Sequence, residues 1–469
     1  MTVSKRTSQF SRGIDLPAIL SFFALAIIGW LSLFASSYSG TGFSEVFSLS
    51  TEIGRQTIWL GLSVIGFIAI LSFDWKFWST FAYVIYGFSV FLLLAVLIFG
   101  TEVKGSTSWF NVAGFSFQPS EFAKLGTCLA VASLLGSTQI NVKHNNHFFL
   151  ALGLAVIPAI LILLQPDAGS AMVFSSFLIL FYRAGANSLY YVLGIALLTN
   201  IILTLVFGIT PILVITLLAM IGVLMVTINS DIRFLANFLL LSLACFVFYQ
   251  YGYLIPIFVV LSIVPIALAV YMIRENKIQQ LVWTAISVII SVFITLITKW
   301  SFTNVLLPHQ QDRINVWLRP DLCEPRGSLY NIIQSKTAIG SGGFWGSGFL
   351  NGAMTKLDFV PEQNTDFIFC TIGEEHGFIG VLGVIILFFV LLYRIIVMAE
   401  RTRLDFIRYY MYGVAGIIFF HVFINIGMTM GIMPVVGIPL PLMSKGGTSI
   451  LVFFLMMGIL FKMDLIRNR

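Results

Sequence analysis

The chain has 469 residues, of which 58% are hydrophobic and only 10% charged, and its 26 Lys and Arg against 20 Asp and Glu give a net charge of +6. Soluble domains carry about 25% charged and about 45 to 50% apolar residues, so this composition excludes an ordinary soluble protein. At about 20 residues per bilayer crossing, roughly 270 apolar residues supply about 13 or 14 spans and leave little for a globular domain. The composition predicts an all-α polytopic membrane protein.

Apolar runs long enough to cross a bilayer follow one another along the chain. They predict helices near residues 16–36, 57–73, 79–100, 121–137, 148–165, 168–183, 189–207, 211–228, 233–249, 252–273, 281–300, 377–398, 405–430 and 447–463. The first run is too long for a signal-peptide core and lacks a small-residue cleavage site, so we expect it to be retained. The basic residues form no long patch for nucleic acid, and the four cysteines have neither disulfide nor zinc spacing.

Basic residues indicate the orientation of the spans, because cytoplasmic loops are enriched in Lys and Arg. With both termini in the cytoplasm, the cytoplasmic segments hold Lys5, Arg6, Arg12, Lys76, Lys143, Arg183, Arg233, Arg274, Lys277, Arg401, Arg403, Lys462, Arg467 and Arg469. The main exceptions are two outer segments, 101–120 and 301–376. The middle of the spans holds almost no ionisable residue, unlike ion-coupled transporters. We therefore expect the polar chemistry at the outer face, and we expect His421, the deeper exception, to hydrogen-bond another helix.

Segment 301–376 is far longer than an ordinary connection, and its aromatic residues argue against disorder. It should fold as a cap on the membrane surface. Its cations are Arg313, Arg319, Arg326, Lys336 and Lys356. They favour an anionic headgroup as ligand, since Arg binds phosphate through its bidentate fork; the alternative is a set of solvated surface charges. The glycine-rich run at 339–348 either permits close backbone approach to a ligand or is a plain flexible turn.

Asp366 occupies the point where polar sequence gives way to an apolar run. A carboxylate beside hydrophobic surface is partly desolvated, which makes it a better general base. The alternative is a helix N-cap, for which Asp is a preferred residue. Position alone leaves both interpretations open.

The other outer segment leads into a helix that is predicted to begin at Pro119. Glu121 and Lys124 are neighbours at i and i+3 on that helix. They are either one surface ion pair on a capped helix or, with Lys104 and Trp109 before them, a second wall of the same anion site. Farther along, Asp167 lies at the junction of two spans, where a turn residue would also be expected.

Five strings of this sequence, in order, resemble signature segments of the SEDS family (shape, elongation, division and sporulation). They are KGSTSWFNVAGFSFQPSEFAKL, QPDAGSA, YNIIQSKTAIGSGGFWGSGFLNG, FVPEQNTDFIFCTIGEEHGFIG and NIGMTMGIMPVVGIPLPLMSKGGTS. The resemblance covers residues 10–185 and 300–469. The run NIIQSKTAIGSGG is more similar to the elongation branch, RodA, than to the division branch, FtsW.

The resemblance implies a peptidoglycan glycosyltransferase that polymerises lipid II at the outer leaflet and releases undecaprenyl diphosphate, for cell-wall elongation and cell shape. The family's catalytic aspartate, in its Thr-Asp-Phe motif, corresponds to Asp366, which would accept the proton of the acceptor 4-hydroxyl while the donor is inverted. Cations would stabilise the leaving diphosphate; the candidates are Lys104, Lys124, Arg313 and Lys336. A divalent cation, Mg²⁺ or Mn²⁺, is an allowed helper, although no motif resembles a metal cage.

The substrate-binding residues that go with this assignment come from both outer segments and from the C-terminal motif. They are Lys104, Trp109, Gln118, Glu121, Lys124, Asp167, Arg313, Gln334, Lys336, Glu362, Thr365, Ser444 and Lys445. The implied partners are the nascent glycan strand, a class B penicillin-binding protein with transpeptidase activity, and other membrane proteins of an elongation or division complex, with no nucleic acid. The implied location is the bacterial cytoplasmic membrane.

Three features depart from the family pattern. Asn364 stands where the family often has His, and Lys445 stands where Tyr is usual before Gly-Gly. About 90 extra residues between Asp167 and His309 add about four spans to the usual ten. The expected division is N-terminal helices 1–185, inserted helices 186–300, an extracytoplasmic catalytic loop 301–376 and C-terminal helices 377–469. The alternatives are a flippase for lipid-linked precursors, which needs a polar path through the membrane, and a silent scaffold.

Overall fold

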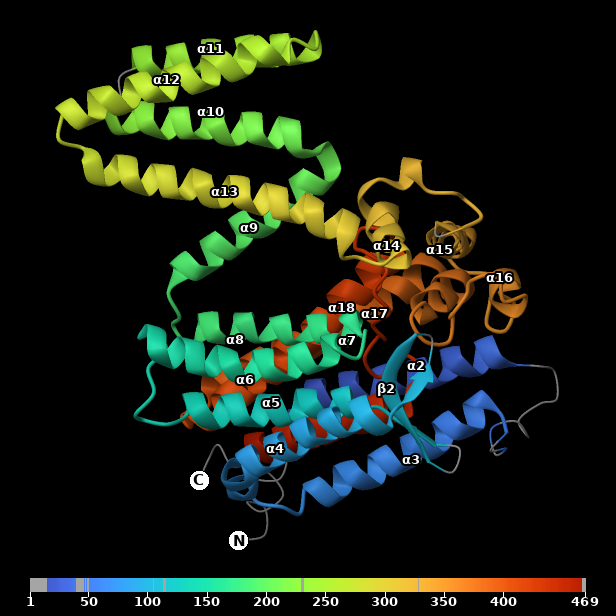
Figure 1. Cartoon of the computed structure of the whole chain (residues 1–469). Helices are drawn as coiled ribbons and strands as arrows, with labels where there is room; N and C mark the ends of the chain where they lie inside the picture. Colours follow the sequence, from blue (N-terminus) through green and yellow to red (C-terminus); the bar gives the residue numbers. More distant parts are fainter. Residues whose placement is uncertain are drawn as a thin grey trace, which may run out of the picture. The chain divides into compact units, whose positions relative to one another are not determined.

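The computed structural model describes residues 15–38, 46, 48, 50–103, 105–112, 115–228, 232–327 and 329–465. The chain divides into two compact units, residues 1–187 with 324–469, and residues 188–323. Among the described residues, eleven helices are long and apolar enough to cross a membrane, and the shorter apolar helices Ala168–Arg183 and Ala236–Gln250 add to them. The predicted all-α polytopic fold is therefore confirmed (Figure 1).

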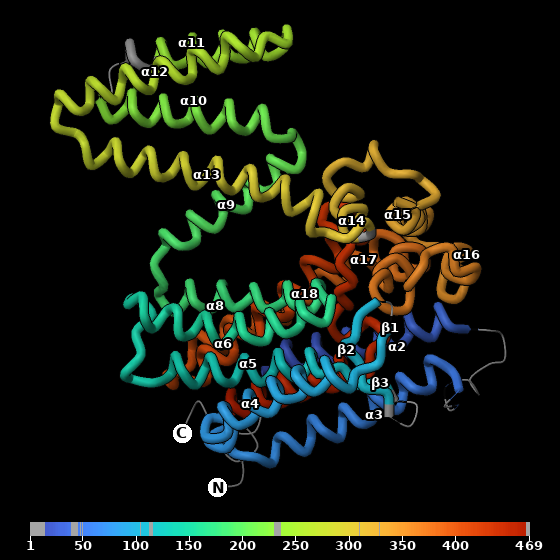
Figure 2. The backbone as a smooth tube through the Cα atoms, viewed as in Figure 1, coloured from blue at the N-terminus to red at the C-terminus, as the bar shows by residue number. Residues whose placement is uncertain are grey.

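The first unit is a helical bundle with three largely buried helices at its centre. Its helices are α2 (Leu16–Ser37), α3 (Glu52–Ile70), α4 (Trp75–Phe99), α5 (Pro119–Leu135), α6 (Asn145–Leu163), α7 (Ala168–Val173), α8 (Phe177–Arg183), α15 (Tyr330–Ser341), α16 (Ala353–Lys356), α17 (Ile368–Arg401), α18 (Asp405–Thr429) and α19 (Gly447–Leu465). The most apolar stretches of α18 and α19 are each 72% buried. Helix α5 has 15 of its 17 residues buried, so α5, α18 and α19 together form the core of this unit, whose backbone is traced in Figure 2.

A small antiparallel sheet lies in the segment between α4 and α5. Its strands are β1 (Thr101–Val103), β2 (Ser106–Val112) and β3 (Phe115–Phe117), in the order β1-β2-β3. Gly105, with φ of +81°, lies between the first two strands, in a conformation that glycine adopts without strain. The sheet contacts α4, α5 and α19. The sequence analysis did not predict it.

Helix α17 begins well before its predicted start at 377, because it continues through a kink. The kink is at Gly377, where φ is 61° and ψ is −158°. The glycine-rich run at 339–348 packs on the backbone there: the Phe378 N–H donates to Gly343 O at 2.9 Å, and a Cβ on Gly342 would lie 2.0 Å from Gly373 O. The glycines therefore allow close approach to the protein's own helix, a contact that neither predicted alternative, a ligand contact or a flexible turn, had included.

An ion-pair network joins α2, α17 and α19 at the ends of these helices remote from α15 and α16. Asp15 caps α2 and binds Arg394 at 2.6 Å and Arg401 at 3.2 Å, and Arg401 also binds Asp464 at 2.6 Å. Burial alone would raise the pKa of Asp15, but the hydrogen bond and charge of Arg394 hold it below its ordinary value. The network fixes where the three helices meet.

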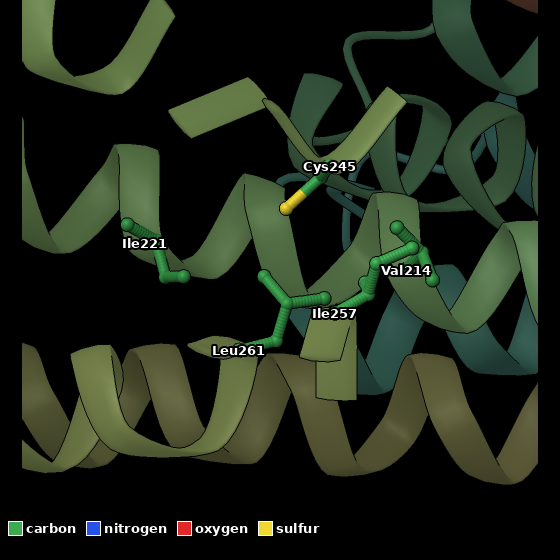
Figure 3. Packing of buried hydrophobic residues seen from close by; sticks show 5 residues of the cluster. All are labelled: Val214, Ile221, Cys245, Ile257 and Leu261. Atoms are coloured by element: carbon green, nitrogen blue, oxygen red, sulfur yellow. The ribbon is translucent and has the colours of Figure 1, made fainter. Parts of the chain in front are cut away.

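The second unit is a separate group of mostly lipid-facing helices. They are α9 (Ser188–Phe207), α10 (Ile209–Ile228), α11 (Ile232–Gln250), α12 (Leu254–Arg274), α13 (Ile278–Asn304) and α14 (Pro308–Leu318). Figure 3 shows its buried cluster, formed by Val214, Ile221, Cys245, Ile257 and Leu261. The unit extends to Cys323, so it takes in the first part of the predicted loop 301–376.

Candidate functional site

Asp366 lies on a turn just before α17 and is half-buried. The helix begins at Ile368 with Phe367 as its cap residue, so the N-cap alternative for Asp366 was wrong. On α18, the buried Asn425 donates from Nδ2 to the Asp366 carbonyl oxygen at 2.8 Å and to Ile438 O at 2.7 Å. One amide therefore holds the backbone of Asp366 against the segment that follows α18.

The loop between α18 and α19 packs directly on the Asp366 turn. A Cβ added to Gly437 would lie 3.2 Å from the Asp366 carboxylate oxygen Oδ2, a tight contact, and the φ of +72° at this position favours glycine. The Ser444 hydroxyl donates to Thr365 O, and the Lys445 N–H donates to Asn364 O at 2.8 Å. The predicted residues Thr365, Asp366, Ser444 and Lys445 are thus brought together from two distant motifs.

Two cavities open beside this turn. The first, of about 250 Å³, is lined by Glu52, Arg55, Gln56, Trp59, Val103, Trp109, Ser116, Thr365, Lys445, Gly446 and Gly447. The second, of about 240 Å³, is lined by Glu52, Asp358, Val360, Pro361, Glu362, Gln363, Asn364, Thr365 and Lys445. Glu52, Thr365 and Lys445 line both. The first cavity presents indole rings and a guanidinium, while the second presents three carboxylates.

Four lining residues from the first turns of α3 were missed by the sequence analysis: Glu52, Arg55, Gln56 and Trp59. The predicted helix began at 57, so Glu52, Arg55 and Gln56 fell in an outer connection, while Trp59 lay inside the predicted span and was not considered as a site residue. A signal was present, because Arg55 is a cation on the side where the positive-inside rule expects few. It should have been grouped with the other two exceptional segments.

Gln118 and Asp167 form a second polar junction near the sheet. Gln118 Nε2 donates to Asp167 Oδ2 at 3.1 Å, and the other Asp167 oxygen accepts from the Ser170 N–H at 3.0 Å as the cap of α7. The Gln118 N–H donates to Thr448 Oγ1 on α19 at 3.2 Å. Asp167 is therefore a helix cap that also ties α7 to the start of α5.

Glu121 and Lys124 lie inside the bundle. Lys124 Nζ is 2.8 Å from Glu121 Oε1 and 2.9 Å from His421 Nε2, and all three residues are at most 2% exposed. His421 Nδ1 faces Pro439 O at 3.1 Å and must donate to it, so Nε2 is left to accept from the ammonium. The ion pair is real but buried, so the predicted surface pair was wrong. His421 bonds another helix, as predicted.

The remaining predicted residues have different positions. Lys336 is exposed on α15, with Nζ 2.8 Å from where a Cβ on Gly431 would be. Gln334 is half-buried on the same helix, and Glu362 accepts from Thr365 Oγ1 at 3.0 Å. Arg313 belongs to α14 of the second unit, and Lys104 lies outside the described residues. No group of three or more His, Cys, Asp or Glu placed to hold a metal ion occurs among the described residues.

The arrangement suits a reaction in which a weakly acidic hydroxyl loses its proton. Asp366 is held on a hydrogen-bonded turn, and its neighbour Thr365 lines a cavity with aromatic and cationic side chains. A fixed carboxylate can act as general base, and cations stabilise charge that develops on a departing anion. Aromatic surface suits the flat faces of a sugar ring or the boundary with lipid.

Comparison with known proteins gives a consistent result over nearly the whole chain. The family model described as "Cell cycle protein", which covers FtsW, RodA and SpoVE, matches residues 16–211 and 259–468. The peptidoglycan glycosyltransferase RodA of Treponema pallidum is 32% identical over 454 residues, which are 96% of this chain and 97% of the relative. The peptidoglycan glycosyltransferase MrdB of Escherichia coli K12 is 29% identical, covering 98% of this chain and 96% of the relative.

Solved structures agree in fold. The rod shape determining protein RodA of Thermus thermophilus is 20% identical with a TM-score of 0.55 and covers 97% of this chain and 98% of its own. A chain from a structure described as a peptidoglycan synthase complex is 22% identical with a TM-score of 0.59 and covers 97% and 99%. The family model leaves residues 212–258 unmatched, and these lie inside the predicted insertion. The chain therefore belongs to the FtsW, RodA and SpoVE family, the SEDS family that its motifs resemble.

Proposed function

We propose that this protein is a peptidoglycan glycosyltransferase that polymerises lipid II into glycan strands, with Asp366 as the general base. The observation that carries the proposal is the placement of Asp366: its turn is bonded to α18 and to the α18–α19 loop, beside two cavities. Relatives aligned over nearly the full chain are named peptidoglycan glycosyltransferases, which supports the same reaction class.

The reaction is a single displacement at the donor sugar. The acceptor 4-hydroxyl oxygen attacks the anomeric carbon of the donor, and the bond from that carbon to the diphosphate oxygen breaks. The hydroxyl proton passes to the Asp366 carboxylate, and the electron pair of the broken bond leaves with undecaprenyl diphosphate. General base catalysis of this kind contributes about 10² to 10⁴ in rate.

The leaving diphosphate gains negative charge, so cations near Asp366 are worth most at that moment. Arg55 is exposed in the aromatic-lined cavity, and Lys336 is exposed on α15. We assign these two side chains to the diphosphate. Lys124 is a weaker candidate than the sequence suggested, because Glu121 and His421 already occupy its ammonium group.

A divalent cation would be held here by one or two carboxylates of the protein, since Mg²⁺ usually binds through few protein ligands together with substrate phosphates rather than in an all-protein cage. Asp358 and Glu362 in the second cavity are the side chains that could contribute. The ion would supply charge neutralisation at the leaving group.

The site is proposed to face the outside of the bacterial cytoplasmic membrane, with both termini in the cytoplasm. Support comes from the basic residues at the opposite helix ends, among them Lys143, Arg183, Arg401 and Lys462. A penicillin-binding protein is the proposed partner, because the glycan would still need cross-linking and a related fold occurs in a peptidoglycan synthase complex. An elongation role follows the likeness to RodA.

The test is reconstitution of the purified full-length protein in liposomes that carry lipid II, with and without a class B penicillin-binding protein. We expect long glycan strands and release of undecaprenyl diphosphate, both lost when the lipid-linked donor is replaced by the free disaccharide. Transfer of lipid II between leaflets without any polymer would instead establish the flippase alternative and overturn the proposal.

A further inference from the structure

Glu52, the first residue of α3, joins two segments that meet beside Asp366. Its Oε1 lies 2.5 Å from Lys445 Nζ, and its Oε2 accepts from Asn364 Nδ2 at 2.8 Å. The Lys445 N–H in turn donates to Asn364 O at 2.8 Å. Three segments distant in sequence therefore close a ring of hydrogen bonds, which we call the Glu52 latch (Glu52, Asn364 and Lys445).

The latch lies at the boundary of the two cavities. Glu52 and Lys445 line both cavities, and Asn364 lines the second. Asn364 is two residues before Asp366, and Lys445 follows Ser444, whose hydroxyl binds Thr365 O. Whatever holds Asn364 to Lys445 therefore also sets the position of the Asp366 turn.

Stability does not explain the latch. Its two charged side chains are 33% and 39% exposed, and ion pairs so open to solvent contribute little to folding. The pair does remove Lys445 as a free cation, since its ammonium already has a carboxylate partner. Its chief effect is geometric, because a carboxylate that accepts from two segments fixes their separation.

We infer that Glu52 is a positioning residue for Asp366, and that Lys445 acts through Glu52 rather than by binding the diphosphate. The inference rests on the proposed function for its kinetic consequence but not for its structural one. Loosening the latch lets the Asp366 turn move away from the acceptor hydroxyl. General base catalysis is steeply sensitive to such displacement, so turnover falls while substrate binding is kept.

A charge swap separates a positional role from a direct one. The double variant Glu52→Lys with Lys445→Glu restores the ion pair with the two charges exchanged, the positive one at position 52 and the negative one at position 445. The Asn364 side chain can take part again by turning its amide, because its Oδ1 has no hydrogen-bond partner among the described atoms and accepts as readily as Nδ2 donates. A Lys445 that binds diphosphate could not be replaced by glutamate.

The experiment measures two things on the full-length protein in liposomes: amide hydrogen exchange of the peptide 358–367, and kcat and KM for polymerisation. Glu52→Ala should speed exchange about tenfold and lower kcat about tenfold with KM within threefold of wild type. Glu52→Gln keeps an oxygen that accepts from Lys445 Nζ, but its Nε2 can bond Asn364 only if the Asn364 amide turns so that Oδ1 accepts, so this variant should fall between. The swap should restore both readouts to within threefold of wild type. Glu102→Ala, an exposed glutamate on β1, is the matched control and should change neither.

Unchanged exchange in Glu52→Ala would overturn the inference, and so would faster exchange with wild-type kcat. Swap protein that regains normal exchange but stays inactive would show that Lys445 acts on substrate. If wild-type protein makes no polymer, the proposed function fails, and the exchange data still decide whether the latch holds the turn.

Discussion

The two units of the chain use polar groups in different ways. In the first unit, α18 and α19 are surrounded by protein and bury charged and amide side chains such as Lys124, Glu121 and Asn425. In the second unit, only 6% of the apolar stretch of α9 or of α13 is buried, and the interhelical polar contacts between these two helices are neutral, from Asn200 to Ser291 and Thr295. A charge needs a protein partner inside a membrane, whereas neutral groups can be satisfied between two lipid-facing helices.

That difference indicates where the chemistry resides. Residues 212–258, which the family model does not match, belong entirely to the second unit, whereas every contact of the Asp366 turn described above is made within the first. Additional membrane spans can join a group of lipid-facing helices with little effect on stability or on the site. A bundle that shelters charges and fixes a catalytic turn tolerates far less change.

The largest effect on stability is expected from the buried ion pair of the first unit. Lys124→Met leaves the Glu121 carboxylate buried without its cation, which should lower the free energy of unfolding by about 3 to 5 kcal/mol. Glu121→Gln combined with Lys124→Met removes both charges and should recover most of that loss. The measurement is unfolding of the three variants in the same detergent.

If Lys124→Met protein is as stable as wild type, the claim that Glu121 depends on Lys124 as its buried partner is wrong. If the double variant is stable but makes no polymer, the two side chains also act on substrate, as the sequence analysis predicted.

A smaller effect is expected at the opposite helix ends, where Asp15 binds Arg394 and Arg401. Asp15→Asn should cost about 1.5 to 3 kcal/mol at neutral pH, because charged hydrogen bonds are lost. The folded-state pKa of Asp15 lies below its ordinary value of 3.8, so its contribution is complete above that pH and disappears as the pH falls through the folded-state value. Wild type and variant should therefore converge in acid. If the difference in unfolding free energy between wild type and Asp15→Asn stays constant at low pH, the linkage to Asp15 protonation is ruled out.

The smallest effect is expected in the second unit. Asn200→Leu removes the hydrogen bonds to Ser291 and Thr295 and should lower stability by about 0.6 to 1.7 kcal/mol, the range for such bonds between membrane helices. Polymerisation per folded molecule should stay at the wild-type level. A large loss of activity with normal folding would mean that the second unit takes part in the chemistry.

The spans could be predicted from the sequence because their apolar length is a local property, and α2, α6, α9 and α18 begin within a few residues of their predicted starts. The start of α17 could not, since polar residues before Gly377 continue the helix across a kink on which the glycine-rich run packs, and that long-range contact leaves no local pattern. The three-stranded sheet was missed because two of its strands have only three residues each.

Asp366 was identified through its motif and its place at a polar-to-apolar boundary. Its fixation by Asn425 and the α18–α19 loop depends on contacts between residues far apart in the chain, which no local pattern contains. Lys124 was misjudged for the same reason: its partner His421 is 297 positions away. Arg55 alone carried a local signal that was overlooked.

The most direct test of the account is the rate of glycan-strand growth by Asp366→Asn protein in liposomes, with wild type beside it and unfolding measured on both. The account predicts a loss of about 10² to 10⁴ in rate, the contribution of a general base, with a normal melting temperature and undiminished binding of lipid II. Strand growth at the wild-type rate by correctly folded Asp366→Asn protein would contradict it.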